Sequence, residues 1–163
     1  VHRRQRQMCI RDSFEHIKEV VELVKISSTK IDDSVIIASY LHDIVEDCKA
    51  TRKEIKDLFG HDVVELVEEM TDKPFCSEAE RRSNQIMAAK IMSIDASLIK
   101  LADKISNLEN LFHDPPISWS KKEIIDYIKW GQEVVNNLPY KDMKLMKRFY
   151  KICFQLNKKL SSN

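Results

Sequence analysis

Glycine and proline are scarce in this chain. Its 163 residues include two glycines, Gly60 and Gly131, and four prolines. A sheet protein with many short strands needs frequent turns, which glycine and proline supply. Their scarcity therefore argues against that class. Charged residues make up 33% of the chain, which is typical of amphipathic helices, and the length suits one domain with a sizeable core.

Three further absences restrict the function. No apolar run approaches the roughly 20 residues that cross a bilayer. The four cysteines are scattered without a CxxC pair, as in a reduced cytosolic protein. The net charge is only +1, so the chain lacks the basic field of nucleic-acid binders. We therefore expect a cytoplasmic protein with a small-molecule substrate and no nucleic-acid or membrane partner; the oligomeric state is left open.

Apolar spacing and capping signals predict one all-α domain, a bundle of seven or eight helices. Three segments read as capping boxes, beginning at Thr51, Ser77 and Ser120. The pair Pro115-Pro116 ends a strongly periodic core helix. The expected helices cover 14–27, 32–47, 51–59, 62–70, 77–91, 96–111, a segment from 120 to Pro139, and a last segment ending near Lys158.

The first thirteen residues, VHRRQRQMCIRDS, have no amphipathic period that continues into the next segment. They resemble translated sequencing-adapter sequence. We expect residues 1–13 to be non-native, or else a basic disordered arm, and residues 14–163 to form the domain. On the first interpretation, the native N-terminus is missing.

Residues 38–47, Ala-Ser-Tyr-Leu-His-Asp-Ile-Val-Glu-Asp, are the most informative stretch. On a continuous helix, His42 lies one turn from Glu46, and Asp43 one turn from Asp47. Ionisable groups on a helix that otherwise looks buried are costly unless they bind something. A divalent metal and a catalytic water are the obvious candidates.

A second polar group interrupts the periodic helix over 96–111. Asp103 lies among apolar residues, and Asn107 follows one turn later on the same face. Together with His16, His42 and Asp43, Asp103 completes a candidate set of two imidazoles and two carboxylates without a thiolate. That mixture suits a catalytic divalent ion better than a structural zinc.

These motifs resemble a known family. His42-Asp43, with Asp103 downstream and His16 upstream, is similar to the HD phosphohydrolase superfamily. The finer pattern is similar to the hydrolase domain of RelA/SpoT proteins, most of all to the small stand-alone SpoT homologues. It comprises LHDIVED at 41–47, Thr51, LFG at 58–60, VEEMTD at 67–72 and KLADKISNL at 100–108. The likeness extends from about Phe14 to Leu138.

The resemblance implies manganese-dependent hydrolysis of the 3′-pyrophosphate of guanosine tetra- or pentaphosphate, (p)ppGpp, to GDP or GTP plus pyrophosphate. It also implies roles for individual residues. The metal ligands would be His16, His42, Asp43 and Asp103, and the catalytic pair Glu46 and Asp47. Substrate would be bound by Asn107, with Lys104, Tyr127 and Arg81 as further candidates.

Other interpretations stay open for these residues. Arg81 and Lys104 can be solvated surface charges, and Tyr127 can have a packing role together with Trp119 and Trp130. The same metal site can serve another nucleotide, such as NADPH losing its 2′-phosphate, or belong to a catalytically weak nucleotide-sensing module.

Two departures from the family pattern concern nucleotide affinity. The basic segment before the first histidine is not reproduced in residues 1–13. Glu109 stands where relatives commonly carry arginine, which reverses a charge expected close to the site.

Overall fold

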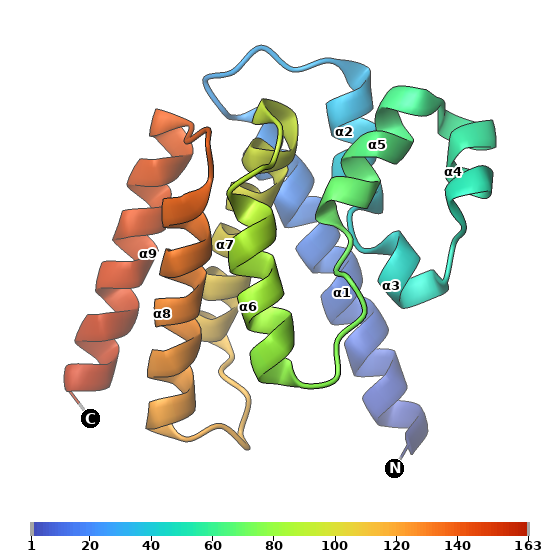
Figure 1. Cartoon of the computed structure of the whole chain (residues 1–163). Coiled ribbons are helices and arrows are strands. Elements are labelled where there is room, and N and C mark those ends of the chain that lie inside the picture. Colours follow the sequence, from blue (N-terminus) through green and yellow to red (C-terminus); the bar gives the residue numbers. More distant parts are fainter. Residues whose placement is uncertain (1, 163) are drawn as a thin grey trace.

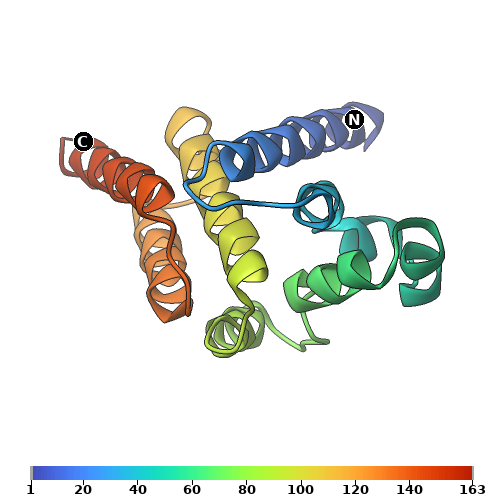
Figure 2. The same cartoon turned by 90° about the horizontal axis from the view of Figure 1, so that it is seen from above.

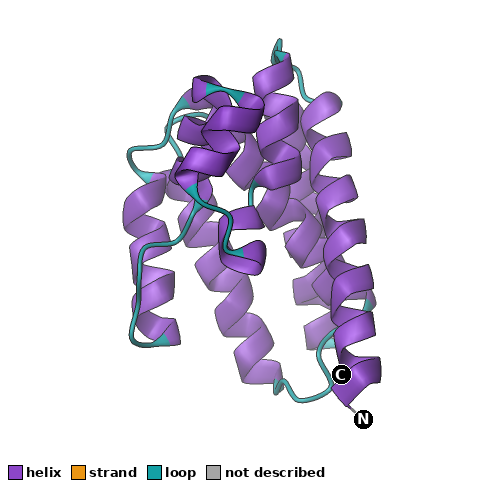
Figure 3. Cartoon of the chain, turned by 90° about the vertical axis from the view of Figure 1, so that its right-hand side faces the viewer, coloured by secondary structure: helices purple, strands orange, loops and turns teal. Residues whose placement is uncertain are grey.

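The computed structural model describes the backbone of residues 2–162 and the side chains of residues 14–162. This part of the chain contains helices and loops but no strand (Figures 1 and 3). The all-α prediction is therefore confirmed. The helices are α1 (His2–Lys25), α2 (Asp33–Leu41), α3 (Ile44–Cys48), α4 (Arg52–Phe59), α5 (His61–Met70), α6 (Glu78–Ala89), α7 (Ile94–His113), α8 (Lys121–Asn137) and α9 (Met143–Ser161).

Helix α7 is the centre of the bundle. It packs against α1, α2, α5, α8 and α9, and in Figure 2 it runs between α8–α9 on one side and α1–α2 on the other. Residues on all sides of α7 are buried, including Leu98, Ile99 and Leu101, as expected of a helix surrounded by others. A polar side chain on α7 at the level of the core is therefore costly unless it has a partner.

The first helix differs from its prediction at the N-terminal end. Helix α1 begins at His2 rather than near residue 14. The side chains of residues 1–13 lie outside the described part, so their proposed non-native origin stays a prediction. From Phe14 onward, Val20, Val21 and Val24 are buried at helical spacing, as the apolar pattern predicted.

The predicted continuous helix over 32–47 is wrong. Helix α2 ends at Leu41, His42 and Asp43 form a turn, and α3 restarts at Ile44. Asp43 has φ −105° and ψ 2°, in the sparsely populated bridge region where many active-site residues lie. The break has a functional consequence, because it places the histidine at the end of one helix and the acids Glu46 and Asp47 in the first turn of the next.

The capping predictions hold at two of three positions. Thr51 and Ser120 form complete capping boxes with the glutamates three residues later. Ser77 caps the Glu80 N–H, but the Glu80 carboxylate accepts from the Cys76 N–H instead. Between α4 and α5, Gly60 adopts a φ of 92°, which glycine reaches without steric cost.

None of the helices in the described chain is both long and apolar enough to span a membrane.

Candidate active site

Two histidines and an aspartate from three different helices meet in the core. His16 comes from α1, His42 from the end of α2, and Asp103 from the middle of α7. Asp103 Oδ1 lies 3.2 Å from His16 Nε2 and 3.9 Å from His42 Nε2. One ligand atom of each residue lies within 4.8 Å of the other two. Residues 87 apart in the chain thus converge, as a shared metal site requires.

The Nδ1 atom of each imidazole, which faces away from the cluster, already forms a hydrogen bond. His42 Nδ1 donates to the Ser39 carbonyl at 2.8 Å. His16 Nδ1 lies 2.8 Å from the Ser106 hydroxyl, which donates in turn to Glu19 at 2.6 Å. Because Ser106 gives its proton to Glu19, it accepts from His16 Nδ1. Both histidines therefore present a lone pair on Nε2, the tautomer that binds metal ions.

His42 Nε2 is a buried nitrogen without a hydrogen-bond partner in the described structure. An unsatisfied buried polar atom costs about 1–3 kcal/mol. A divalent ion among His42, His16 and Asp103 would satisfy this atom, and the N/O donor set suits it. Asp43 lies beside the cluster, with Oδ2 3.2 Å from His42 Nε2. The residues therefore fit a metal ion.

Asp103 stays ionised despite its burial. Burial alone would raise the pKa of its carboxyl, but the charges of Lys104 and Lys100 hold that pKa well below its usual range. Lys104 Nζ lies 3.4 Å from Asp103 Oδ2, and Asn107 donates to Oδ1 at 2.8 Å. For Lys104 itself, burial lowers the pKa while Asp103 opposes the shift. A permanently charged carboxylate is what a cation site needs.

The cluster forms the floor of a pocket of 260 Å³ between α1, α3, α6, α7 and α8. Nine of the ten predicted site residues line it, and the tenth, His42, lies in the buried cluster behind it. The lining residues are His16, Asp43, Glu46, Asp47, Met70, Asp72, Arg81, Gln85, Lys100, Asp103, Lys104, Asn107, Tyr127 and Trp130.

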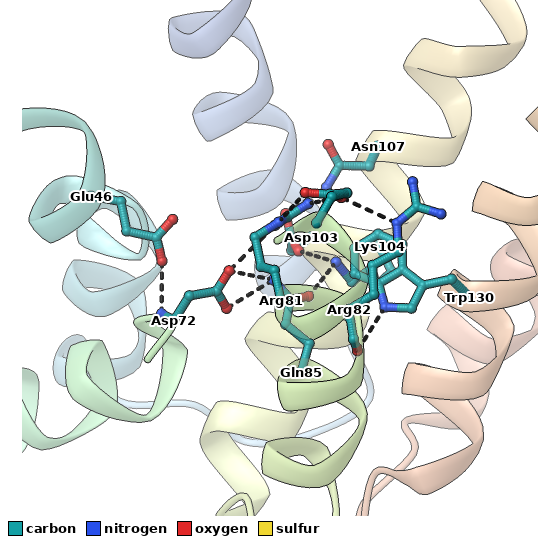
Figure 4. A network of polar contacts seen from close by, with 10 residues as sticks. Glu46, Asp72, Arg81, Arg82, Gln85, Asp103, Lys104, Asn107 and Trp130 are labelled. Carbon is teal, nitrogen blue, oxygen red and sulfur yellow. Dashed lines mark hydrogen bonds and ion pairs between the residues drawn. The ribbon is translucent and has the colours of Figure 1, made fainter. Parts of the chain in front are cut away.

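Glu46 is held at one wall of the pocket by Asp72 (Figure 4). The Asp72 N–H donates to Glu46 Oε1 at 2.7 Å. Partial burial raises the pKa of Glu46; the Asp72 N–H opposes this rise, whereas the Asp72 and Asp43 charges add to it. Burial, rather than repulsion from the neighbouring Asp47, is thus the main cause of the raised pKa of Glu46. A raised pKa suits a carboxylate that takes a proton near neutral pH.

Arg81 is not a free cation. It bonds to Asp72 at 3.3 Å and to Glu78 at 2.9 Å, and the Asp72 carboxylate also accepts from Gln85 at 2.8 Å (Figure 4). These contacts fix one wall of the pocket and leave Arg81 beside the opening, with a quarter of its side chain exposed.

Two lysines of α7 lie one turn apart under the pocket. Lys104 is tied to Asp103, to Gln85 at 3.2 Å, and to the face of Trp130, 4.2 Å from the ring centroid. Lys100 is only 5% exposed and lines the pocket without an ion pair or hydrogen bond to any described side chain. A buried ammonium without a partner is costly, so Lys100 is available to an anionic ligand.

Tyr127 belongs to an aromatic row at the pocket rim. Its ring lies 5.3 Å from Trp119 and 5.2 Å from Trp130, and burial raises the pKa of its phenol. Packing and a place in the pocket wall are therefore both observed, where the sequence offered them as alternatives.

Sequence reasoning assigned no role to Asp72 or Gln85, and it offered Lys100 only as a member of a phosphate-binding patch with Arg81 and Lys104. Asp72 lies within the quoted motif VEEMTD, so a signal existed for it. Gln85 on α6 had no signal. The expected charge reversal at Glu109 does not reach the pocket, because Glu109 forms a double contact with Arg148 of α9 at 2.6 and 2.8 Å.

Comparisons with known proteins agree with this geometry. The HD-domain family model matches residues 1–124. A Drosophila melanogaster protein named guanosine-3′,5′-bis(diphosphate) 3′-pyrophosphohydrolase MESH1 is 37% identical over 139 residues, 84% of this chain and 78% of the relative. Homo sapiens MESH1 is 40% identical over 109 residues, 66% of this chain and 61% of the relative. The chain thus spans less than two thirds of the human protein.

Solved structures show the same architecture. One, described as a metazoan ortholog of SpoT that hydrolyzes ppGpp and plays a role in starvation responses, has a TM-score of 0.80 at 35% identity. The match covers 86% of this chain and 79% of the chain in the solved structure. A Listeria monocytogenes protein with a TM-score of 0.72 at 22% identity, over 86% of this chain and 94% of its own, shows the fold alone. The chain therefore belongs to the HD-domain family, in the branch of small stand-alone SpoT-like proteins.

Proposed function

We propose that this chain is a metal-dependent phosphohydrolase that removes the 3′-pyrophosphate of (p)ppGpp, yielding GDP or GTP and pyrophosphate. The observation that carries the proposal is the buried, unpartnered Nε2 of His42 in the His16–His42–Asp103 cluster under an open polar pocket. The names of the similar MESH1 proteins supply the substrate.

His16, His42, Asp43 and Asp103 would hold one divalent ion, and we propose manganese. When bound, such an ion lowers the pKa of water and offsets negative charge on a phosphate oxygen. The roles of the protein are then to keep both imidazoles in the binding tautomer, through Ser39 and Ser106, and to keep Asp103 ionised, through Lys104.

Glu46 acts as the general base. Its carboxylate faces the pocket, its pKa is raised by partial burial, and the Asp72 N–H fixes its orientation. It takes a proton from the attacking water as the new P–O bond forms and the bond between that phosphorus and the ribose 3′-oxygen breaks; the 3′-oxygen takes up a proton and leaves as the hydroxyl of the nucleotide. Asp47, in the same first turn of α3, orders that water from the pocket edge.

The cations of the pocket bind the substrate phosphates. Hydrolysis of a phosphate ester that releases pyrophosphate depends on positioning and charge neutralisation. Lys100, which has no ion pair or hydrogen bond to a described side chain, and Lys104 lie under the pocket, and Arg81 lies at its rim. Asn107 and Tyr127 add an amide and a phenol to the wall. We infer that Lys100 binds the pyrophosphate group directly.

A second candidate substrate keeps the same site. Metal ligands and bases act on the phosphate rather than on the nucleoside, so NADPH losing its 2′-phosphate uses the same residues. A catalytically weak sensing module is less well supported, because such a module does not need Glu46 oriented by a dedicated backbone N–H.

Ser106 offers a test of the histidine tautomer. We expect Ser106→Ala to weaken metal binding by about 10–100-fold, because His16 Nδ1 loses the acceptor that fixes its tautomer. The measurement is a manganese titration of the metal-free protein. Ser97→Ala, a buried hydroxyl of the same helix without a hydrogen-bond partner in the described structure, is the control. Equal manganese affinity in the two variants would contradict this role of Ser106.

The substrate itself is tested by competition. The purified protein with manganese is given ppGpp and NADPH at equal concentration, and the products are separated. The proposal expects GDP and pyrophosphate as the main products. Phosphate release from NADPH, with ppGpp intact, would show that NADPH rather than ppGpp is the substrate. The proposed metal site would stay as it is.

A further inference from the structure

Helix α9 concentrates positive charge at one edge of the molecule. It carries six lysines and arginines and no acidic residue, although the net charge of the whole chain is only +1. In Figures 1 and 2, α9 lies at the edge of the bundle opposite α3 and α4. The cations of α9 are Lys144, Lys147, Arg148, Lys151, Lys158 and Lys159.

Most of these charges have no acidic partner. Arg148 is paired with Glu109, and Lys159 donates to the Phe112 carbonyl at 2.7 Å. The other four are exposed lysines that form no ion pair with any described residue: Lys144, Lys147, Lys151 and Lys158. Like charges along one helix repel each other, so an anionic partner complements this face.

The outer face of α9 also carries a row of apolar side chains. Met143, Tyr150 and Phe154 are 74%, 60% and 70% exposed. Spacings of seven and four residues place them on one stripe of the helix. The opposite face already packs into the core through Leu145, Phe149 and other residues, so the exposed row is not part of the core. Apolar side chains aligned in this way mark a contact surface.

A hollow of 540 Å³ lies beside the C-terminal half of this row. Phe112 and Phe154 contribute its aromatic walls, and Lys151, Lys158 and Lys159 line it as well. Apolar surface next to ammonium groups suits a molecule whose phosphate adjoins hydrocarbon.

We propose that the outer face of α9 docks on an anionic phospholipid surface, a partner that the net charge of the whole chain did not predict because the cations gather on this one helix. Met143, Tyr150 and Phe154 enter the boundary between headgroups and acyl chains, and the four unpaired lysines lie over the lipid phosphates. A membrane surface fits the whole row better than RNA, because Met143 is an aliphatic thioether that cannot stack on a base as the aromatic Tyr150 and Phe154 can. The catalytic pocket contains no residue of α9, so the docked enzyme keeps it open.

Vesicle co-sedimentation tests the proposal with the purified 163-residue chain. We expect binding to phosphatidylcholine vesicles that contain phosphatidylserine, none to phosphatidylcholine alone, and loss of binding at high salt. Changing Lys147, Lys151 and Lys158 together to alanine should weaken partition by roughly 100-fold, since each lysine near an anionic surface contributes about 1 kcal/mol. The double variant Tyr150→Ser/Phe154→Ser should weaken it independently of salt.

The matched control changes Lys53, Lys56 and Lys90 to alanine. These lysines are exposed, lie outside α9 and alter the net charge equally. Equal partition of the two triple variants would overturn the proposal, as would equal binding to neutral vesicles. Binding of a single-stranded RNA with the same lysine dependence, without vesicle binding, would also overturn it. So would a dimer in light scattering that Tyr150→Ser/Phe154→Ser dissociates, because the row would then be a self-interface.

Discussion

Asp103→Ala is expected to leave the purified protein without bound manganese and without measurable turnover. Asp103 Oδ1 is the atom that both histidine Nε2 atoms face, at 3.2 and 3.9 Å. Its removal takes away the only carboxylate of the buried cluster in the described structure and leaves Lys104 buried without its anionic partner, which destabilises a fold by about 3–5 kcal/mol. We therefore expect a lower melting temperature as well.

Asp103→Asn separates these effects. The amide keeps the shape of the side chain and one oxygen, so the fold is better retained, but the negative charge that a divalent ion needs is gone. Metal content by elemental analysis and thermal unfolding are measured on both variants. Asp95→Asn makes the same chemical change in the first turn of α7, outside the pocket, and should keep full metal content. A folded Asp103→Asn protein that still holds one manganese per chain would refute the assignment of Asp103.

Glu46→Gln has the second largest expected effect, and it acts on turnover rather than on the metal. A glutamine keeps an oxygen for the Asp72 N–H, so the wall of the pocket stays in place, but it cannot accept a proton. We expect kcat to fall by roughly 100- to 10,000-fold, with KM and manganese content close to those of the unaltered protein.

Glu133→Gln, at an exposed position of α8, is the control for this substitution and should turn over normally. If Glu46→Gln retains a rate within a few-fold of the control, the proton is taken by another group, and Asp47 becomes the next candidate. If Glu46→Gln instead loses the metal, Glu46 acts as a ligand, and the proposed division of roles is wrong.

Local signals in the sequence predicted most of the helices. Thr51 and Ser120 mark the first turns of their helices, because a capping box is formed by residues within four positions of each other. The apolar residues that recur along α7 reflect the burial of this helix on all sides. The break at His42–Asp43 was not predictable in this way. The residues from Asp33 to Asp47 look helical throughout, whereas the segment after the turn contacts a distant part of the chain, as Glu46 does with the Asp72 N–H.

The candidate site shows the same contrast between local sequence signals and contacts that form only in the folded chain. Single motifs singled out His42 and Asp43, the apolar pattern of its helix singled out Asp103, and the family resemblance supported His16 as a ligand. The groups that hold them could not be found from spacing. Ser106 and Glu19 are ordinary residues in their helices. Ser106 forms hydrogen bonds with both Glu19 and His16, and these bonds exist only because α1 packs on α7. Gln85 likewise acquires its place from the packing of α6 beside Asp72 and Lys104.

Pyrophosphate release from ppGpp tests directly whether this chain is a metal-dependent ppGpp hydrolase. The purified protein is stripped with EDTA, assayed, and assayed again after manganese is restored, beside Asp103→Asn under the same conditions. We expect no release from the stripped protein, recovery with manganese, and no recovery in the variant. Release that persists after EDTA, or no release from a wild-type protein that binds one manganese per chain, would contradict it.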